Sequence, residues 1–341
     1  MTKSTNALRN NITLLFSSII LSVLFLEIAL RIILPIPIKW TFPQESYDFD
    51  PLIGHGLKPG QQAYTHDKTV TTNSIGIRDA EYSPTPATGI YRILALGDSQ
   101  TFGNGLKLKD TWPKQFEHEL NQSDTDKHFE VLNSGLPSSN TWQHELIFNR
   151  MITNYAPDAA VLAFYTNDVV KRFKPNPSLN EAKSASYRKL IYILKRSALL
   201  LSLRQVYYYF RKPTKSDLKG QAILRGEDDE EIKERWLQVE RSLDKIKQVA
   251  DNRNMIFFIA SLPRRDQVDG RLPWNAYNNH LKTITEKLGI SMLSMLEPLQ
   301  KGYEAYNTKL FIPWDGHNSK IANHIIAQEI TKEMLGQLKK Q

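Results

Sequence analysis

The sequence predicts an α/β protein with a doubly wound, parallel, five-stranded sheet, helices on both faces and one N-terminal membrane-spanning helix. Three observations support this prediction. Short apolar runs alternate with helical patterns along residues 88–341, the segments between the runs are long enough for crossover helices, and one long apolar stretch lies near the N-terminus. Strands that are buried on both faces read as continuous apolar runs, as these do.

The composition is that of a globular protein. Of 341 residues, 41% are hydrophobic and 23% are charged, and the net charge is +8. A basic chain can meet nucleic acid, an anionic membrane or an acidic polymer. No zinc-finger spacing, aromatic RNA-binding box or basic-region helix is present, so no nucleic-acid partner is expected. The lack of cysteine excludes disulfides, thiolate metal sites and a cysteine nucleophile.

Residues 12–34 predict a transmembrane anchor. The stretch holds only two charges, Glu27 and Arg31, which can pair across one helical turn. As a helix it would extend about 35 Å, which is enough to cross a bilayer. No small-residue cleavage site follows, which favours an uncleaved anchor over a signal peptide. The short tail, residues 1–11, is basic, which predicts a single-pass cell-membrane protein with a cytoplasmic N-terminus and the rest extracytoplasmic (periplasmic in a Gram-negative source).

Residues 35–87 predict a turn-rich linker with short strands, and residues 88–341 predict the main domain. Its five predicted strands are 91–96, 128–133, 158–165, 255–260 and 290–294, and residues 319–336 predict a closing helix. The segment between the third and fourth strands is too long for one crossover, so residues 171–250 are expected to be a helical insertion.

Two interpretations of residues 187–212 within this insertion are open. The stretch is aliphatic and aromatic with basic residues throughout, so it fits a helix pair packed on the sheet. It also fits an interfacial helix lying on the bilayer, its bases against anionic headgroups. The acidic run at 226–235 is expected to begin the next helix, where carboxylates suit the positive end of the dipole.

Polar residues follow three of the predicted strands, and ligands bind at the carboxyl ends of such strands. Ser99 follows the first strand, while Asp315 and His317 precede the last helix. A hydroxyl, an imidazole and a carboxylate are what acyl transfer requires. We expect Ser99 to be the nucleophile, His317 the base and Asp315 the group that orients the imidazole. The alternative is that Ser99 merely caps a helix.

Negative charge develops on the substrate carbonyl oxygen during acyl transfer, so hydrogen-bond donors must point at it. The candidate oxyanion-hole donors are the backbone N–H groups of Ser99 and Ser138 and the side-chain amide of Asn167. His324, in the closing helix, is a reserve candidate for the base.

Four blocks in this order resemble the SGNH (GDSL-type) hydrolase superfamily over residues 88–335. They are "GDSQTFG" (97–103), "VLNSGLPSSNT" (131–141), "YTND" (165–168) and "DGHNS" (315–319), while "LEIALRI" and "NSIGIRDAEY" are similar to membrane-anchored members. The resemblance implies a flavodoxin-like fold and an esterase that removes an O-acyl group, such as acetyl or another short acyl, through an acyl-Ser99 intermediate. It implies an acylated glycan or a lipid ester as substrate.

The chain departs from the family pattern in three places. Ser138 and Tyr165 stand where glycine is usual, and a serine can donate its N–H only if the local φ does not require glycine. Asp315 precedes His317 by two residues, which is similar to exopolysaccharide O-acetyltransferase-type members. An O-acyltransferase acting on a glycan, or a non-catalytic member that binds a glycan or lipid or acts as a scaffold, therefore stays open.

Four further residues are candidates for substrate binding: Arg78, Gly135, Tyr165 and Trp314. Arg78 either meets an anionic substrate group or stabilises a turn. The remaining histidines show no metal-ligand spacing, and no glycine-rich phosphate loop is present. No metal or cofactor is expected, and the sequence identifies no protein partner. The membrane partner is lipid, through residues 12–34 and, in the interfacial interpretation, 187–212.

Overall fold

The computed structural model describes residues 2–33, 40–170, 190–191, 194, 196–313 and 315–340. The chain divides into two compact units. Residues 41–182 and 213–341 form the first, called here the globular unit. Residues 1–40 and 183–212 form the second, called the helical unit.

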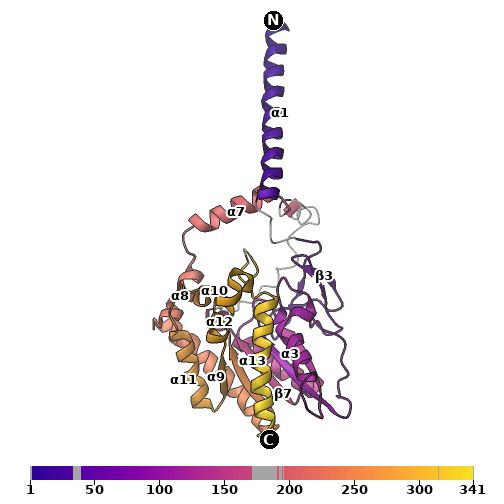
Figure 1. The fold of residues 1–341 in the computed structure, drawn as a ribbon, viewed down its shortest axis with the longest axis vertical. Helices are drawn as coiled ribbons and strands as arrows, with labels where there is room; N and C mark the ends of the chain where they lie inside the picture. The colour runs from indigo at the N-terminus through magenta and orange to yellow at the C-terminus, as the bar shows by residue number, and fades with distance from the viewer. Residues whose placement is uncertain are drawn as a thin grey trace. The chain divides into compact units, whose positions relative to one another are not determined.

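A five-stranded parallel sheet is the centre of the globular unit (Figure 1). Its strands, in spatial order, are β6 (His128–Gly135), β5 (Ile90–Gly97), β7 (Ala159–Phe164), β8 (Ile256–Ser261) and β9 (Ser291–Ser294). The predicted fold class is confirmed, and each strand differs from its predicted bounds by one or two residues. Numbered by their order along the chain, these five strands lie in the spatial order 2-1-3-4-5. The direction of the strand order reverses at β5, because β6 and β7 flank it on opposite sides, and doubly wound sheets bind their ligands at such a point.

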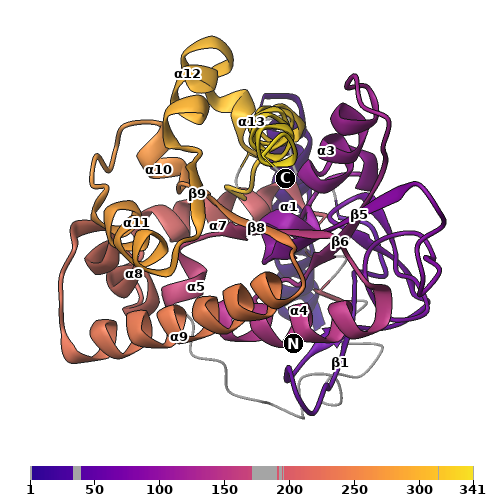
Figure 2. The same ribbon diagram turned by 90° about the horizontal axis from the view of Figure 1, so that it is seen from below.

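Helices cover both faces of the sheet (Figure 2). One face carries α4 (Thr141–Tyr155), α9 (Glu230–Asn252) and α11 (Ala276–Leu288), and the other carries α3 (Trp112–Asn121), α12 (Leu296–Tyr306) and α13 (Lys320–Leu338). Leu94 and Leu96 of β5 pack with the first group, whereas Ile93 and Ala95 pack with the second. Successive side chains point to opposite faces, and both faces are buried, which explains the continuous apolar runs.

Side-chain caps begin three of the helices that cover the sheet, α4, α9 and α13. Asp229 accepts a hydrogen bond from the Ile232 N–H at 2.8 Å, so the acidic run opens α9 as predicted. Asn140 and Gln143 form a capping box at the start of α4. The other helical elements that the structure describes in this unit are α2 (Ser99–Phe102), α5 (Asn167–Val170), α8 (Lys215–Arg225), α10 (Arg265–Val268), η1 (Leu108–Asp110) and η3 (Asn307–Leu310).

Two small antiparallel sheets precede the main sheet. The first pairs β1 (Tyr47–Asp48) with β2 (Gly56–Leu57), and the second pairs β3 (Gln62–Thr65) with β4 (Lys68–Thr71). His66 lies in the turn between β3 and β4 with φ +55° and is buried. This hairpin supplies the His66 side chain to the candidate site.

The helical unit contains α1 (Thr2–Ile33) and α7 (Ala198–Phe210). Over Arg9–Ile33, α1 is long and apolar enough to cross a membrane, by length and composition. It begins before the predicted anchor, whose last residue, Leu34, lies outside the described residues. Of the segment 187–212, the structure describes 190–191, 194 and 196–212, which include α7.

Candidate functional site

Ser99 is the first residue of α2, directly after the carboxyl end of β5. Asp98 is the N-cap of this helix, because its side chain accepts a hydrogen bond from the Gln100 N–H at 2.9 Å. The alternative in which Ser99 caps the helix is therefore wrong. Gly97 permits the tight turn, since its φ is +150° and a Cβ there would lie 2.1 Å from the Thr101 hydroxyl.

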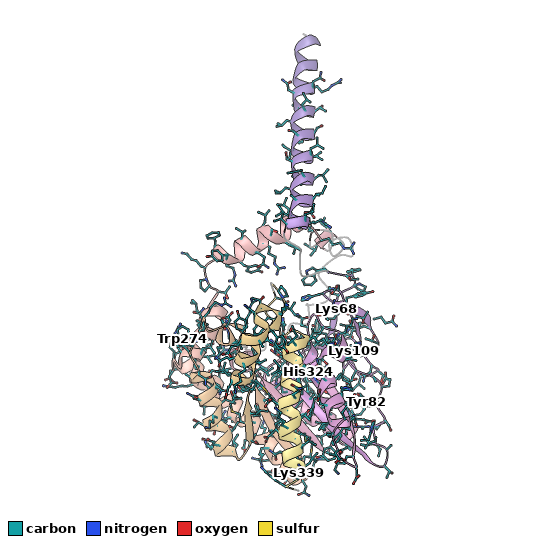
Figure 3. The ribbon with its side chains drawn as sticks, viewed as in Figure 1. Lys68, Tyr82, Lys109, Trp274, His324 and Lys339 are labelled. Atoms are coloured by element: carbon teal, nitrogen blue, oxygen red, sulfur yellow. The ribbon has the colours of Figure 1, made fainter. Side chains whose placement is uncertain are left out.

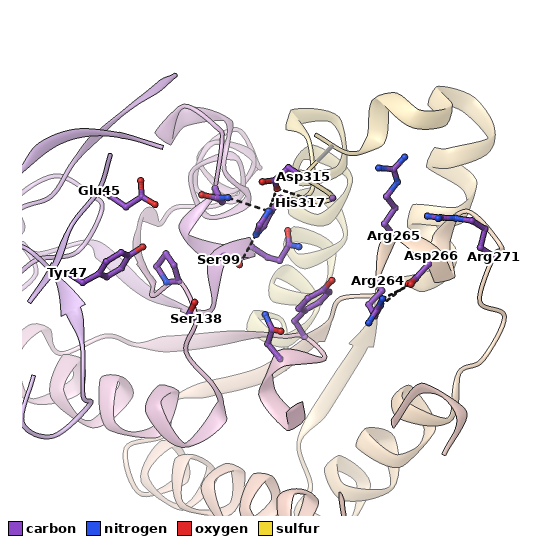
Figure 4. A pocket seen from close by; sticks show the side chains of 16 residues that line it. Glu45, Tyr47, Ser99, Ser138, Arg264, Arg265, Asp266, Arg271, Asp315 and His317 are labelled. Atoms are coloured by element: carbon purple, nitrogen blue, oxygen red, sulfur yellow. Dashed lines mark hydrogen bonds and ion pairs between the residues drawn. The ribbon is translucent and has the colours of Figure 1, made fainter. Parts of the chain in front are cut away.

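The structure brings Ser99, His317 and Asp315 together in one row (Figure 4). His317 lies in the loop before α13, and its Nε2 is 2.9 Å from the Ser99 Oγ. Its Nδ1 contacts the Asp315 Oδ1. With the ring proton on Nδ1, facing the carboxylate, Nε2 is the atom that can accept the serine proton.

Asp315 also contacts a second imidazole, that of His66. The His66 Nε2 lies 3.1 Å from the Asp315 Oδ2. Burial raises the pKa of Asp315, but hydrogen bonds from His317 and His66 outweigh that effect and hold the pKa well below its usual range. The carboxyl is therefore ionised at neutral pH. Reasoning from the sequence missed His66, because spacing along the chain carries no signal of a contact made by a distant hairpin turn.

Ser138 lines the same pocket and is exposed. Its φ is +69°, which lies in the left-handed region where glycine is favoured. The condition stated for a serine here, that the local φ does not require glycine, is therefore met only with strain, because a side chain in this conformation costs about 1–2 kcal/mol. A backbone N–H is available at this position whichever side chain is present.

Asn167 is the first residue of α5, after β7, and its side chain lines the pocket. Its Nδ2 donates a hydrogen bond to the Asp98 Oδ2 at 2.7 Å, which orients the amide. Asp98 is fully buried, and burial together with the charge of Asp168 raises its pKa. Hydrogen bonds from the Gln100 N–H and Asn167 act in the opposite direction on that pKa.

A buried row of three side chains lies between the loops that carry Ser138 and Asn167. The Ser139 Oγ is 2.7 Å from the His144 Nε2, and the His144 Nδ1 is 3.1 Å from the Asp168 Oδ1. All three residues are at most 5% exposed, so a substrate has no access to them. The row therefore joins the two loops instead of reacting. Sequence reasoning missed this role for His144 too.

The pocket has a volume of about 560 Å³. Beyond the residues above, its lining includes Glu45 and Tyr47 on one side of Ser99 and three arginines on the other, Arg264, Arg265 and Arg271 (Figure 4). Tyr165, a candidate substrate-binding residue, lines it as well. Its described lining contains no Leu, Ile, Val, Met or Phe side chain.

Two arginines of the lining are held by neighbouring carboxylates. The Arg264 guanidinium meets both oxygens of Asp266, at 2.9 and 2.6 Å. Arg271 is paired in the same way with both oxygens of Asp269, at 2.9 and 2.7 Å. These pairs fix the positions of the guanidinium groups at the pocket rim and reduce the net positive charge that a substrate meets there.

Arg78 lies away from the pocket lining, so the alternative in which it meets an anionic substrate group is wrong. Its guanidinium is fully buried and donates to the carbonyl oxygens of Phe102, Gly103, Thr69 and Leu106 at 2.6–3.0 Å. Burial lowers its pKa to about 10, which leaves it charged at neutral pH. The arginine ties the β3–β4 hairpin to the loop after α2, which is the turn-stabilising alternative.

Gly135 and His324 are not among the residues that line the pocket. Gly135 serves packing, because a Cβ there would lie 2.1 Å from the backbone nitrogen of Phe102. His324 is on α13 (Figure 3), outside the pocket lining and 3.7 Å from Glu119, so it is not placed to act as a base for Ser99. Trp314 lies outside the described residues. Within the described part of the chain, no three His, Asp or Glu side chains gather as a metal site would need.

Neither a family model nor a curated protein matches this chain. Solved structures do match over 71–73% of this chain and 98% of theirs. They include a G-D-S-L family lipolytic protein from Desulfitobacterium hafniense (13% identity, TM-score 0.41), the esterase EstA from Pseudoalteromonas sp. (14%, 0.42) and an acetyl xylan esterase, AlAXEase (13%, 0.41). At these identities and TM-scores, the likeness says nothing of this chain's own chemistry.

Proposed function

We propose that this chain is a membrane-anchored ester hydrolase of the SGNH type, acting through an acyl-Ser99 intermediate. One observation carries the proposal: the Ser99 Oγ lies 2.9 Å from the His317 Nε2, while the other ring nitrogen contacts an ionised Asp315. A serine hydroxyl is a weak nucleophile until a base takes its proton, and this arrangement supplies that base.

The reaction needs no group that the chain lacks. As the Ser99 Oγ attacks the ester carbonyl carbon, its proton passes to the His317 Nε2. Collapse of the tetrahedral intermediate breaks the bond to the alcohol oxygen, which takes the proton from His317 and leaves. Water then attacks the acyl-serine, again giving a proton to His317, and the acid is released as Ser99 regains its proton.

Asp315 keeps the His317 ring proton on Nδ1, so that Nε2 can accept the serine proton, and it stabilises the imidazolium that forms at each step. The oxyanion would be met by the N–H groups of Ser99 and Ser138 and by the amide of Asn167. The hydrogen bond from Asn167 to Asp98 supports this assignment, because a donor that is already oriented needs no rearrangement in the transition state.

The pocket lining supports a short acyl group on a polar alcohol, such as an O-acetylated glycan, over a lipid ester. Binding a long acyl chain draws on apolar surface, at about 0.8 kcal/mol for each buried methylene. The described lining offers carboxylates, guanidinium groups, amides, hydroxyls and two tyrosine rings instead. Sugar hydroxyls bind to such groups by hydrogen bonds.

An O-acyltransferase is the second candidate, and the different linings on the two sides of Ser99 support it. Glu45 and Tyr47 line one side of Ser99 and the arginines line the other, so an acyl donor and a sugar acceptor could bind on opposite sides (Figure 4). The two activities differ only in the acceptor that attacks acyl-Ser99. Incubation with a labelled acetyl donor and a polysaccharide separates them, because the label is either released as acetate or retained by the polymer.

We further propose that α1 spans the cell membrane with its N-terminus in the cytoplasm and the globular unit outside. The apolar helix of sufficient length and the basic tail support this topology. A cysteine introduced at an exposed site of the globular unit should react with an impermeant maleimide on intact cells. Reaction only after lysis would contradict the topology.

A fluorophosphonate probe tests the chemistry, since it reacts with activated serines. The wild-type protein should be labelled and should hydrolyse p-nitrophenyl acetate, and Ser99→Ala should lose both properties. Ser291→Ala, a change at an exposed serine of β9, is the matched control and should keep both. Glycan binding by a wild-type protein that is never labelled would instead identify a non-catalytic binding protein.

A further inference from the structure

The helical unit contains a contact that the proposed chemistry does not use. The Glu27 carboxylate on α1 accepts hydrogen bonds at the first turn of α7, from the Ser197 hydroxyl at 2.8 Å and from the N–H groups of Ala198 and Leu199 at 2.8 and 2.9 Å. The two N–H groups are donors that a helix N-terminus leaves unpaired within the helix. Glu27 therefore acts as a cap supplied by another helix, and α7 runs across α1 at this point (Figures 1 and 2).

Arg31, one turn further along α1, strengthens the same junction. Its Nε donates to the Glu27 Oε1 at 2.7 Å, and its Nη2 donates to the Arg196 carbonyl oxygen at 3.0 Å. The two charges of α1 thus neutralise each other and both bind the chain that leads into α7. A charge pair in an apolar helix is tolerated when its hydrogen bonds are satisfied in this way.

The position of Glu27 along α1 gives the depth of this junction. Residues 10–26 of α1 are without charge, and such a stretch of helix rises about 25 Å. The hydrocarbon core of a bilayer is about 30 Å thick. If α1 crosses the membrane with this stretch in the core, Glu27 lies at the outer boundary between acyl chains and headgroups, and α7 begins at the same level.

The surface of α7 fits that location. Leu203, Val206, Tyr207 and Phe210 form a stripe at the spacing of one helix face, and they are 54, 53, 66 and 77% exposed. Ala198 and Leu201 point to the opposite side and are buried. An exposed apolar stripe with two aromatic rings is costly in water and is typical of a helix at a membrane interface.

The basic residues of α7 favour binding to an anionic lipid surface. Arg204 and Arg211 flank the stripe, each packed over the Tyr208 ring at 5.2 and 5.1 Å, and Lys212 follows. Residues 197–212 hold no acidic side chain. Basic residues beside an apolar face bind anionic headgroups while that face enters the acyl region.

We propose that α7 is an interfacial helix that lies in the outer headgroup region of the bilayer crossed by α1, and that Glu27 fixes its position there. The inference rests on the proposed membrane span. Because α7 lies between β7 and α8 in the sequence, the chain returns to the bilayer in the middle of the globular fold. The partner is the anionic lipid surface; a protein partner is an alternative outcome of the test.

The absence of native cysteine allows a direct depth measurement on the full-length chain. Single cysteines at Leu21, Val206 and Leu237 would carry a fluorophore in phosphatidylcholine–phosphatidylglycerol liposomes that contain spin-labelled quencher lipids. Leu21 reports the span, Val206 reports the stripe, and Leu237, exposed on α9, is the matched apolar control. We expect strong quenching at 21 and 206 and at least threefold weaker quenching at 237.

The outcomes separate the two proposals. Quenching at 21 with position 206 at the level of 237 would overturn the interfacial helix and leave the span. No quenching at 21 would overturn the span and the inference with it. Protection of position 206 from iodide without quenching by lipid would mean that a protein covers the stripe, which also contradicts the proposal.

Glu27→Gln tests the junction itself, because it removes the charge while keeping the size of the side chain. We expect quenching at 206 to fall by at least half while quenching at 21 is unchanged. Glu297→Gln, an exposed change on α12, should alter neither signal. Full quenching at 206 in Glu27→Gln would show that Glu27 does not fix the position of α7.

Discussion

His66 and His317 bind the two oxygens of one carboxylate, that of Asp315. The His66 Nε2 lies 3.1 Å from the Oδ2, and the His317 Nδ1 contacts the Oδ1. His66 therefore acts on Ser99 only through Asp315 and His317, which makes it a positioning residue. Its contact helps to hold the carboxylate in place beside the His317 imidazole.

Removing His66 should slow catalysis without abolishing it. We expect His66→Ala to lower kcat about tenfold, which corresponds to about 1.4 kcal/mol in the barrier, with little change in KM. His66→Gln, which keeps a donor for Asp315, should recover part of the loss. Lys68→Ala, in the same hairpin, is the control and should keep the wild-type kcat. A change confined to KM would contradict the positioning role.

The same contact predicts a pH dependence of stability. The pKa of Asp315 is lowered in the folded state from its ordinary value of 3.8, so its contribution to the unfolding free energy is present above that value and is lost as the pH falls below it. His66→Ala removes one hydrogen bond that lowers this pKa. The variant should therefore lose less stability than the wild type between pH 5 and pH 2, as measured by urea unfolding; an equal or steeper loss would argue against the contact.

Ser138 should gain stability when it is replaced by glycine. At φ +69° the serine side chain is strained, and glycine relieves that strain while keeping the N–H donor. Part of the gain is offset by the greater freedom of glycine in the unfolded chain, so we expect Ser138→Gly to add up to about 1 kcal/mol. Ser138→Ala keeps the strain and is the control. A large loss of kcat in Ser138→Gly would mean that the hydroxyl itself matters.

Asn167 should contribute to the transition state more than to substrate binding. Removal of one oxyanion-hole donor typically lowers kcat by about 10²–10³-fold. We expect a loss of that size in Asn167→Ala with KM changed by less than threefold on p-nitrophenyl acetate. Asn278→Ala, an amide outside the pocket lining, is the matched control. Equal losses in kcat and in affinity would assign Asn167 to ground-state binding.

Replacing His144 should lower both the stability and the kcat of the protein, although no substrate reaches this residue. Its replacement by alanine leaves a cavity and takes the partner from two buried polar groups, which together cost about 2–4 kcal/mol. We expect a lower midpoint in urea and a lower kcat at full folding, because the loops with Ser138 and Asn167 lose their link. His118→Ala, at an exposed position, should change neither. An unchanged kcat in folded His144→Ala would reduce the role of His144 to stability alone.

The sheet could be predicted from the sequence because its strands are buried on both faces and so stand out as apolar runs. Ser99, Asp315 and His317 could be predicted to meet because Ser99 follows a buried strand, while Asp315 and His317 come just before the closing helix. His66 and His144 could not, because their contacts depend on how a hairpin and a helix pack. The sequence left two roles open for Arg78, substrate contact or turn stabilisation, since a charged residue in a turn gives no sign that it will be fully buried.

Peptide mapping by mass spectrometry after reaction with a fluorophosphonate tests the central claim most directly. We predict a single phosphonylated residue, Ser99, in the wild-type protein, and a labelling rate at least a hundredfold lower in folded His317→Ala. An adduct on another serine, or equal labelling rates in the two proteins, would contradict the assignment of Ser99 and His317 as nucleophile and base.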